Sequence, residues 1–300
     1  MKTFTIFANC QSTALAKTLL EHEEFSQKYQ WIEIPAVHEL GNVDIEQVAK
    51  VIQEVDLFLY QPVATSDRRL ENATSAYMLN LLKDSAQALS FPSIYFDGYF
   101  PHLATLGQHK SVLNLVHDYF IAYCYAKGIS KANCVELIGS DELYDKRTSK
   151  KLLKATLSSL KWRERFSRID IRVSAYIEEN YKNKRLFNQF NHPKRDLFVH
   201  LCQKILEKID VDNSEYSSLT LGKKSYLDGI ITPIYRSTYK NLELSFGSDF
   251  DNYSVNKSKL ELCDVVNRFY QFYQHIDKDE LIKVISENKP FVVKRVNKLY

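Results

Sequence analysis

The first hundred residues alternate between short apolar stretches and segments whose apolar residues recur at helical spacing. Strands are predicted over 3–8, 31–36, 56–60 and 93–96, because these stretches are short, apolar and rich in β-branched or aromatic residues. Helices are predicted between them over 12–20, 45–52 and 74–88. Strands that alternate with helices in this way form a parallel sheet with helices on its faces.

The remainder of the chain is mostly helical by the same criterion. Helices are predicted over 112–126, 140–166, 194–209, 260–273 and 278–287, with a strand over 186–190 and a loop over 211–228. No linker-like composition interrupts the chain. We therefore expect one α/β domain over residues 1–300, a Rossmann-like three-layer fold with an open, mainly parallel sheet. A helical extension over 140–180 and C-terminal helices complete it.

Composition narrows the function. The chain has 300 residues and a net charge of +3, which is too weak and too scattered to indicate nucleic-acid binding. Its five cysteines show no C-x-x-C or zinc spacing, which predicts a reducing compartment and no metal site. No apolar run approaches the ~18 residues of a membrane span, and the N-terminus lacks a signal peptide. We expect a soluble, cytoplasmic protein, with self-association into a homo-oligomer left open.

Four polar clusters follow the predicted strands. They are Asn9-Cys10-Gln11, Gln61-Pro62, the segment from Asp97 to His102, and Asn191-His192-Pro193. Open parallel sheets bind ligands at the carboxyl ends of their strands. The four clusters are therefore expected to converge on one site.

Cys10 has the strongest catalytic chemistry in this set. It precedes a predicted helix, whose unpaired N–H groups and dipole favour a thiolate, the nucleophilic form of cysteine. The amides of Asn9 and Gln11 and the backbone of the same turn could hold the oxyanion of an acyl-transfer intermediate. A cysteine here could equally be a small buried residue under the helix. The flanking amides favour the functional interpretation.

His192 is the preferred general base, with Asn191 orienting it or the substrate, and His102 competes for the same role. Asn191 could instead cap the following helix, and His192 could be a surface histidine. A group of basic residues follows two of the strand ends and could meet phosphates at the mouth of the site, although each could equally be a solvated surface charge. These are Arg68, Arg69, Lys194 and Arg195.

The order and spacing of these short motifs resemble the WcbI-type polysaccharide biosynthesis proteins. The likeness rests on Asn-Cys-Gln after the first strand, Gln-Pro after the third, Asp-Gly-Tyr-Phe-Pro-His after the fourth and a late Phe-Asn-His-Pro. It covers nearly the whole chain, and Ala8 stands where the family commonly has Gly. The layout is also similar to that of the SGNH hydrolases, with Cys10 in place of their serine.

The resemblance implies a bacterial capsule enzyme that binds coenzyme A or acetyl-coenzyme A and acetylates a sugar or polysaccharide precursor. It makes Cys10 and His192 the catalytic pair, with Asn9, Gln11, Gln61 and His102 around them. Ser12 and Tyr99 join the basic residues as expected cofactor contacts. Two alternatives stay open at this stage: an esterase that removes acyl groups from a glycan, and a non-catalytic protein that binds coenzyme A or glycan.

Overall fold

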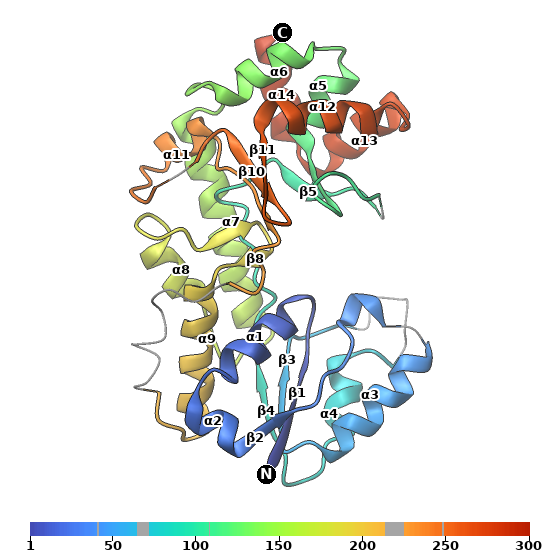
Figure 1. The fold of residues 1–300 in the computed structure, drawn as a ribbon, viewed down its shortest axis with the longest axis vertical. Coiled ribbons are helices and arrows are strands. Elements are labelled where there is room, and N and C mark those ends of the chain that lie inside the picture. Colours follow the sequence, from blue (N-terminus) through green and yellow to red (C-terminus); the bar gives the residue numbers. More distant parts are fainter. Residues whose placement is uncertain (41, 65–71, 108, 214–224, 248) are drawn as a thin grey trace. The chain divides into compact units, whose positions relative to one another are not determined.

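The computed structural model describes residues 1–40, 42–64, 72–107, 109–213, 225–247 and 249–300, except for the side chains of 42–44. The chain forms two compact units, shown in Figure 1. The first contains residues 1–94, 158–179 and 193–227, and the second contains 95–157, 180–192 and 228–300. The expectation of a single domain over 1–300 stays a prediction.

A four-stranded parallel sheet forms the centre of the first unit. Its order is β2-β1-β3-β4, built from β1 (Lys2–Phe7), β2 (Tyr29–Trp31), β3 (Leu57–Tyr60) and β4 (Gln87–Ser90). In the register, Phe7 lies opposite Tyr60, and Tyr60 lies opposite Ser90. The central strands β1 and β3 are buried on both faces, as expected when helices cover a parallel sheet.

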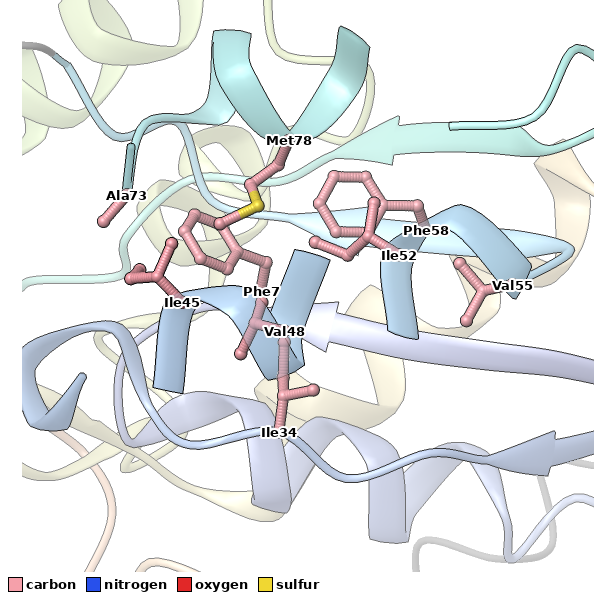
Figure 2. Close-up of a cluster of buried hydrophobic side chains, with 9 residues drawn as sticks. All are labelled: Phe7, Ile34, Ile45, Val48, Ile52, Val55, Phe58, Ala73 and Met78. Atoms are coloured by element: carbon pink, nitrogen blue, oxygen red, sulfur yellow. The ribbon is translucent and has the colours of Figure 1, made fainter. Parts of the chain in front are cut away.

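One face of this sheet carries α3 (Asn42–Glu54) and α4 (Ser75–Asn80) (Figure 1). Phe7 of β1 and Phe58 of β3 point into a cluster with Val48 and Ile52 of α3 and Met78 of α4, as Figure 2 shows. Burying such side chains contributes roughly 1.5–3 kcal/mol each. Side chains from one face of the strands and from one face of α3 thus form a single apolar layer.

The other face is covered by α1 (Gln11–Leu19), α2 (Glu23–Lys28) and α9 (Arg195–Lys208), with α1 packed against both β1 and α9. Phe4 of β1 packs edge-on against Phe25 of α2. The short 3-10 helix η1 (Val37–Glu39), the end of α7 (Lys146–Phe166) and most of α8 (Ser174–Asn180) complete this unit. The first unit is therefore the three-layer fold that the alternation predicts.

The second unit combines short antiparallel sheets with helices. Its strands are β5 (Leu103–Thr105) paired with β6 (Val116–Asp118), and β11 (Ser258–Glu261), β10 (Asn252–Val255) and β9 (Ile230–Ile231) in that order. The strand β7 (Phe187–Gln189) pairs with β8 (His192–Pro193). The helices are α5 (Tyr119–Ala126), α6 (Lys131–Gly139), α11 (Arg236–Asn241), α12 (Leu262–Tyr273), α13 (Lys278–Asn288) and α14 (Pro290–Leu299), and the beginning of α7. The largely buried α5 packs against α12, α13 and α14.

Several predicted boundaries are wrong. The fourth strand is Gln87–Ser90 rather than 93–96. The N–H of Phe91 donates to the carbonyl of Tyr60 (2.9 Å), and Pro92 then has no N–H with which to continue the hydrogen bonds of the sheet. The helix predicted over 74–88 ends at Asn80 because residues 87–90 pair with β3.

Two predicted helices begin later than expected, each directly after an aspartate that accepts N–H groups of the first turn. The helix predicted from 112 begins at Tyr119, since Asp118 accepts the N–H groups of Phe120 and Ile121 (3.0 and 3.1 Å) and caps it. The helix predicted from 140 begins at Lys146, after Asp145 has accepted the N–H of Thr148 (2.7 Å). The second strand is also misplaced, because β2 covers Tyr29–Trp31 rather than 31–36 and shares only Trp31 with the prediction.

Candidate functional site

Cys10 lies in the turn between β1 and α1, immediately before the helix, with helical backbone angles (φ −53°, ψ −8°). Asn9 shapes this turn. Its side-chain Oδ1 accepts the N–H of Gln11 (3.0 Å), and its carbonyl oxygen accepts the N–H of Ser12 (2.9 Å). Asn9 thereby satisfies two of the donors that a helix start leaves without an intrahelical partner, and it fixes the backbone that carries the Cys10 thiol.

Two buried glutamines connect this turn to the rest of the sheet edge. Gln61, just after β3, accepts the N–H of Asn9 at its Oε1 (3.1 Å) and donates from Nε2 to Oε1 of Gln11 (2.9 Å). Gln11 also donates to the carbonyl of Ile94 (2.9 Å) and accepts the Ile94 N–H (3.2 Å). The ends of β1 and β3 and the segment after β4 are thus joined through two side chains, which hold Cys10 in place.

A pocket of about 500 Å³ opens beside Cys10. Its lining consists of Cys10, Ser12 and Thr13 on one side and residues 33–36 with Glu39 on the other. Backbone hydrogen bonds hold the second side, since the N–H of Ile32 donates to Phe4 (2.8 Å) and that of Val37 to Ala8 (2.9 Å). The pocket is therefore built on the carboxyl end of β1, where an open α/β sheet binds ligands.

The electrostatic surroundings of Cys10 favour the thiol over the thiolate. Burial raises the pKa of Cys10 above its usual value, its backbone N–H partly opposes this shift, and the carboxylate of Glu39 raises the pKa again. The start of α1 alone therefore does not produce a thiolate. A base must take the proton if Cys10 is to act as a nucleophile.

His192 begins the second strand of the β7–β8 hairpin, in the second unit, next to the turn that contains Asn191. Burial lowers the pKa of His192 to about 4, so the imidazole is neutral at physiological pH. Its Nδ1 is buried and has no hydrogen-bond partner among the residues that the structure describes. A neutral ring with an unused nitrogen has the form that a general base needs.

Gln189 is a polar residue in this hairpin that the sequence predictions do not include. It lies directly before the two-residue turn that His192 follows, so the two residues are cross-strand neighbours on one face of the hairpin. Its side chain is fully buried, and neither amide atom has a partner within the described part of the chain. A glutamine within a predicted strand was the available signal.

His102 belongs to a closed polar cluster in the core of the second unit. Its ring stacks on Tyr235 at 3.7 Å between centroids, and its Nε2 lies 3.7 Å from Oδ2 of Asp118. Tyr235 donates its hydroxyl to the same carboxylate. Burial lowers the pKa of His102 and raises that of Asp118 to about 7, although hydrogen bonds partly oppose the shift in Asp118. The substrate-orienting role of His102 stays a prediction.

The expected cofactor contacts have different surroundings. Ser12 lines the Cys10 pocket. Tyr99 is buried in the second unit, where its hydroxyl donates to the carbonyls of Tyr181 and Lys184. Lys194 precedes α9, and the buried Arg195 pairs with Glu21 through both of its terminal nitrogens. Arg68 and Arg69 lie outside the described residues.

Contacts connect the polar clusters in part. The first two, Asn9-Cys10-Gln11 and Gln61-Pro62, converge through the glutamine contacts. The residues that precede the other two contact each other, since the N–H of Phe96 donates to the carbonyl of Phe190 (2.7 Å) and the rings of Tyr95 and Phe190 stack at 6.2 Å between centroids. The convergence of all four clusters on one site stays a prediction. The pairing of Cys10 with His192 stays a prediction.

Comparison with known proteins gives the family. A solved structure described as native WcbI, a polysaccharide biosynthesis enzyme, without a disulfide bond between coenzyme A and one of its cysteines, is similar over 100% of this chain and 99% of its own. The TM-score is 0.83 at 23% identity, which shows a shared fold. No curated protein matches the chain. The sequence profile of the polysaccharide biosynthesis enzyme WcbI matches residues 3–214, and the chain therefore belongs to the WcbI family of polysaccharide biosynthesis enzymes.

Proposed function

We propose that this protein transfers an acetyl group from acetyl-coenzyme A to a sugar hydroxyl in the biosynthesis of capsular or other surface polysaccharide. The observation that carries the proposal is the position of Cys10 beside a pocket at the carboxyl end of β1. Membership of a polysaccharide biosynthesis family supports a sugar as the acceptor. The description of the similar structure, which names coenzyme A with a cysteine, supports a thioester as the donor.

The pocket suits the thiol end of coenzyme A better than its phosphates. Ile34, Pro35 and Ala36 offer apolar contacts to a pantetheine arm, and Ser12 and Thr13 offer hydroxyls. The two acids of the lining, Glu33 and Glu39, would repel phosphate groups. The proposal therefore places the reactive thioester beside Cys10 and the nucleotide outside this pocket.

The reaction can proceed in two steps. The Cys10 thiol gives its proton to His192, and its sulfur attacks the acetyl carbon. The bond from that carbon to the sulfur of coenzyme A then breaks, and the released thiolate takes up the proton from His192. In the second step the sugar hydroxyl loses its proton to His192 and attacks the acetyl-Cys10 carbon, which releases the Cys10 thiolate, and this thiolate takes the proton back from His192. Exchange of one thioester for another is nearly balanced in energy, so the covalent step has no large thermodynamic cost.

A second version omits the covalent step. There His192 deprotonates the sugar hydroxyl, which attacks acetyl-coenzyme A directly, while Cys10 shapes the pocket. In either version the proposal assigns to the Gln189 amide a hydrogen bond to the acceptor, because an amide can donate to one hydroxyl and accept from its neighbour. The two versions share the general base and differ in the role of Cys10.

Intact-mass measurement after incubation with acetyl-coenzyme A tests the covalent version. We expect one acetyl group on the native chain, none on Cys10→Ala, and one on the control Cys263→Ala, since Cys263 is an exposed thiol of the second unit. Full transferase activity of Cys10→Ala would exclude nucleophilic catalysis by Cys10. Release of acetate from acetylated sugars with no dependence on coenzyme A would replace transfer with hydrolysis.

A further inference from the structure

The end of helix α7 exposes two large aromatic side chains that touch each other. Trp162 is 60% and Phe166 72% exposed, and their rings stack at 4.7 Å between centroids with an interplanar angle of 13°. Their spacing of four residues places them on one face of the helix. Single exposed apolar residues are ordinary, but a contiguous pair of this size marks an interaction surface.

Basic residues surround this pair. Lys161 and Arg165 line a hollow of about 530 Å³ together with Ser158 and the two aromatic rings. Arg168 and Arg172 follow just beyond the helix, both exposed. Lys161 pairs with Glu178 (2.6 Å), whereas Arg165, Arg168 and Arg172 have no ion-pair partner among the described residues. Arg165 therefore lies beside the exposed rings without an ion-pair partner in the described part of the chain, and two further exposed arginines follow it in the sequence.

The acidic residues near this surface are engaged by other groups. Glu178 pairs with Lys161, and Oδ2 of Asp170 accepts the N–H and the hydroxyl of Ser90 (2.8 and 2.6 Å). Glu164 is the one acidic residue of α7, and it is 2% exposed. Its Oε1 accepts the N–H groups of Val173 and Ser174 (2.8 and 2.9 Å), and its Oε2 accepts the Ser174 hydroxyl. The carboxylate thus organises the start of α8 from within. Only positive groups of the helix remain on the outer surface.

We propose that this aromatic-basic face, formed by Trp162, Phe166, Arg165, Arg168 and Arg172, docks the protein on an anionic lipid bilayer. Tryptophan is enriched where a protein meets the bilayer interface, and phenylalanine is typical of the apolar face of interfacial helices. Arginines beside them are attracted to the negative surface potential of acidic lipids. Among the described residues no helix is long and apolar enough to cross a bilayer, so the contact is peripheral.

Charge favours lipid over a second copy of the chain as the occupant. A symmetric contact between two copies would place the three unpaired arginines of one copy against those of the other, and like charges in such an interface are repulsive. The proposal is independent of acetyl transfer. Failure of the acetylation experiment leaves it untouched, and the reverse holds as well.

Vesicle binding by the full chain tests the proposal. The chain has two tryptophans, and Trp31→Phe leaves Trp162 as the only tryptophan whose emission can be followed. With vesicles of phosphatidylcholine and phosphatidylglycerol in equal parts, we expect co-flotation at low salt and a blue shift of Trp162 emission. With phosphatidylcholine alone we expect neither. Binding should weaken as salt rises, because the attraction to the arginines is screened.

Two kinds of variant separate the apolar from the charged contribution. Trp162→Ala with Phe166→Ala should abolish flotation, and Arg165→Gln with Arg168→Gln should weaken it on the order of tenfold or more. The controls Tyr300→Ala and Lys50→Gln alter an exposed aromatic residue and an exposed cation elsewhere and should bind as the native chain does. Unchanged thermal unfolding would show that these exposed substitutions leave the fold intact.

Four results would overturn the proposal. One is the absence of flotation with acidic vesicles at low salt. Another is flotation that survives in both double variants. The third is binding to soluble alginate without binding to vesicles. The fourth is a concentration-dependent dimer in sedimentation that the aromatic double variant loses. These last outcomes would assign the face to an acidic glycan or to a second copy.

Discussion

Replacement of Gln11 by leucine tests whether the glutamine network holds the Cys10 turn. The native side chain donates to the carbonyl of Ile94, accepts the Ile94 N–H and accepts Nε2 of Gln61. Leucine fills a similar volume but makes none of these bonds. Both backbone groups of Ile94 then lose this partner in a buried place, while Gln61 keeps its weaker bond to Pro92 (3.3 Å).

The expected loss of stability follows from the carbonyl and the N–H of Ile94, which both lose their hydrogen-bond partner. A buried donor or acceptor left without a partner costs about 1–3 kcal/mol, so Gln11→Leu should lower the free energy of unfolding by about 2–6 kcal/mol. Burial of the added apolar surface offsets on the order of 1 kcal/mol of this. A net loss of several kcal/mol is a large share of the 5–15 kcal/mol that is typical of folded domains.

Urea unfolding followed by tryptophan fluorescence is the assay, because Trp31 and Trp162 both lie in the first unit. Gln27→Leu is the matched control: this glutamine is exposed on α2 and bonds Glu23 (3.2 Å), so its replacement should change stability by less than about 0.5 kcal/mol. The double variant Gln11→Leu with Gln61→Leu should lose less than the sum of the single losses, because the two residues share a bond.

The reasoning fails if Gln11→Leu is as stable as the Gln27→Leu control. It also fails if the double variant loses the full sum, because the shared bond would then have no energetic effect. A further readout is the rate of Cys10 alkylation, which should rise in Gln11→Leu as the turn loosens. An unchanged alkylation rate in a destabilised variant would separate global stability from the positioning of Cys10.

Three other predictions concern single residues. Cys10 should react with iodoacetamide at neutral pH more slowly than a free peptide cysteine, and Glu39→Gln should lower its pKa and speed the reaction most at low salt; an unchanged rate would contradict the influence of Glu39. The pKa of His192 is about 4 in the folded chain and about 6.5 in the unfolded chain, so the unfolded chain binds the proton more readily. The free energy of unfolding should therefore fall by up to about 3 kcal/mol as the pH falls from 6.5 to 4. A His192→Gln variant whose free energy of unfolding, measured with urea, depends on pH as steeply as that of the native chain would refute this. Gln189→Met should leave stability equal or raise it by about 1 kcal/mol while raising KM for the acceptor sugar, and an unchanged KM would remove Gln189 from the site.

The parallel sheet could be predicted because its signal is local. Apart from Thr5, the runs from Phe4 to Phe7 and from Leu57 to Leu59 are apolar, as central parallel strands are, and the helices between them have apolar residues at the spacing that covers the sheet. The boundaries that failed depend on contacts distant in sequence. Residues 87–90 continue a helical pattern in the sequence, but in the folded chain they pair with β3, and this tertiary pairing overrides the local helical preference.

The site follows the same division. That Cys10 stands between a strand and a helix is readable from adjacent residues. The partners of Gln11 are not, since Gln61 and Ile94 lie 50 and 83 positions away. The sequence interpretation treats Gln11 as an oxyanion donor, and the structure shows its amide engaged in holding the sheet edge. The oxyanion role stays a prediction. Gln189 was missed because a polar residue in a strand stands out only when its burial is known.

The division of each unit into separated stretches has a consequence for synthesis on the ribosome. Arg195 pairs with Glu21 from 174 positions further along the chain, and α9 is one of the elements that cover α1. The nascent sheet and its first helices therefore leave the exit tunnel long before that cover exists. The apolar side of α1 stays open to water, or to a chaperone, until translation has passed residue 208. A chain halted near residue 94 should aggregate rather than form a small stable domain.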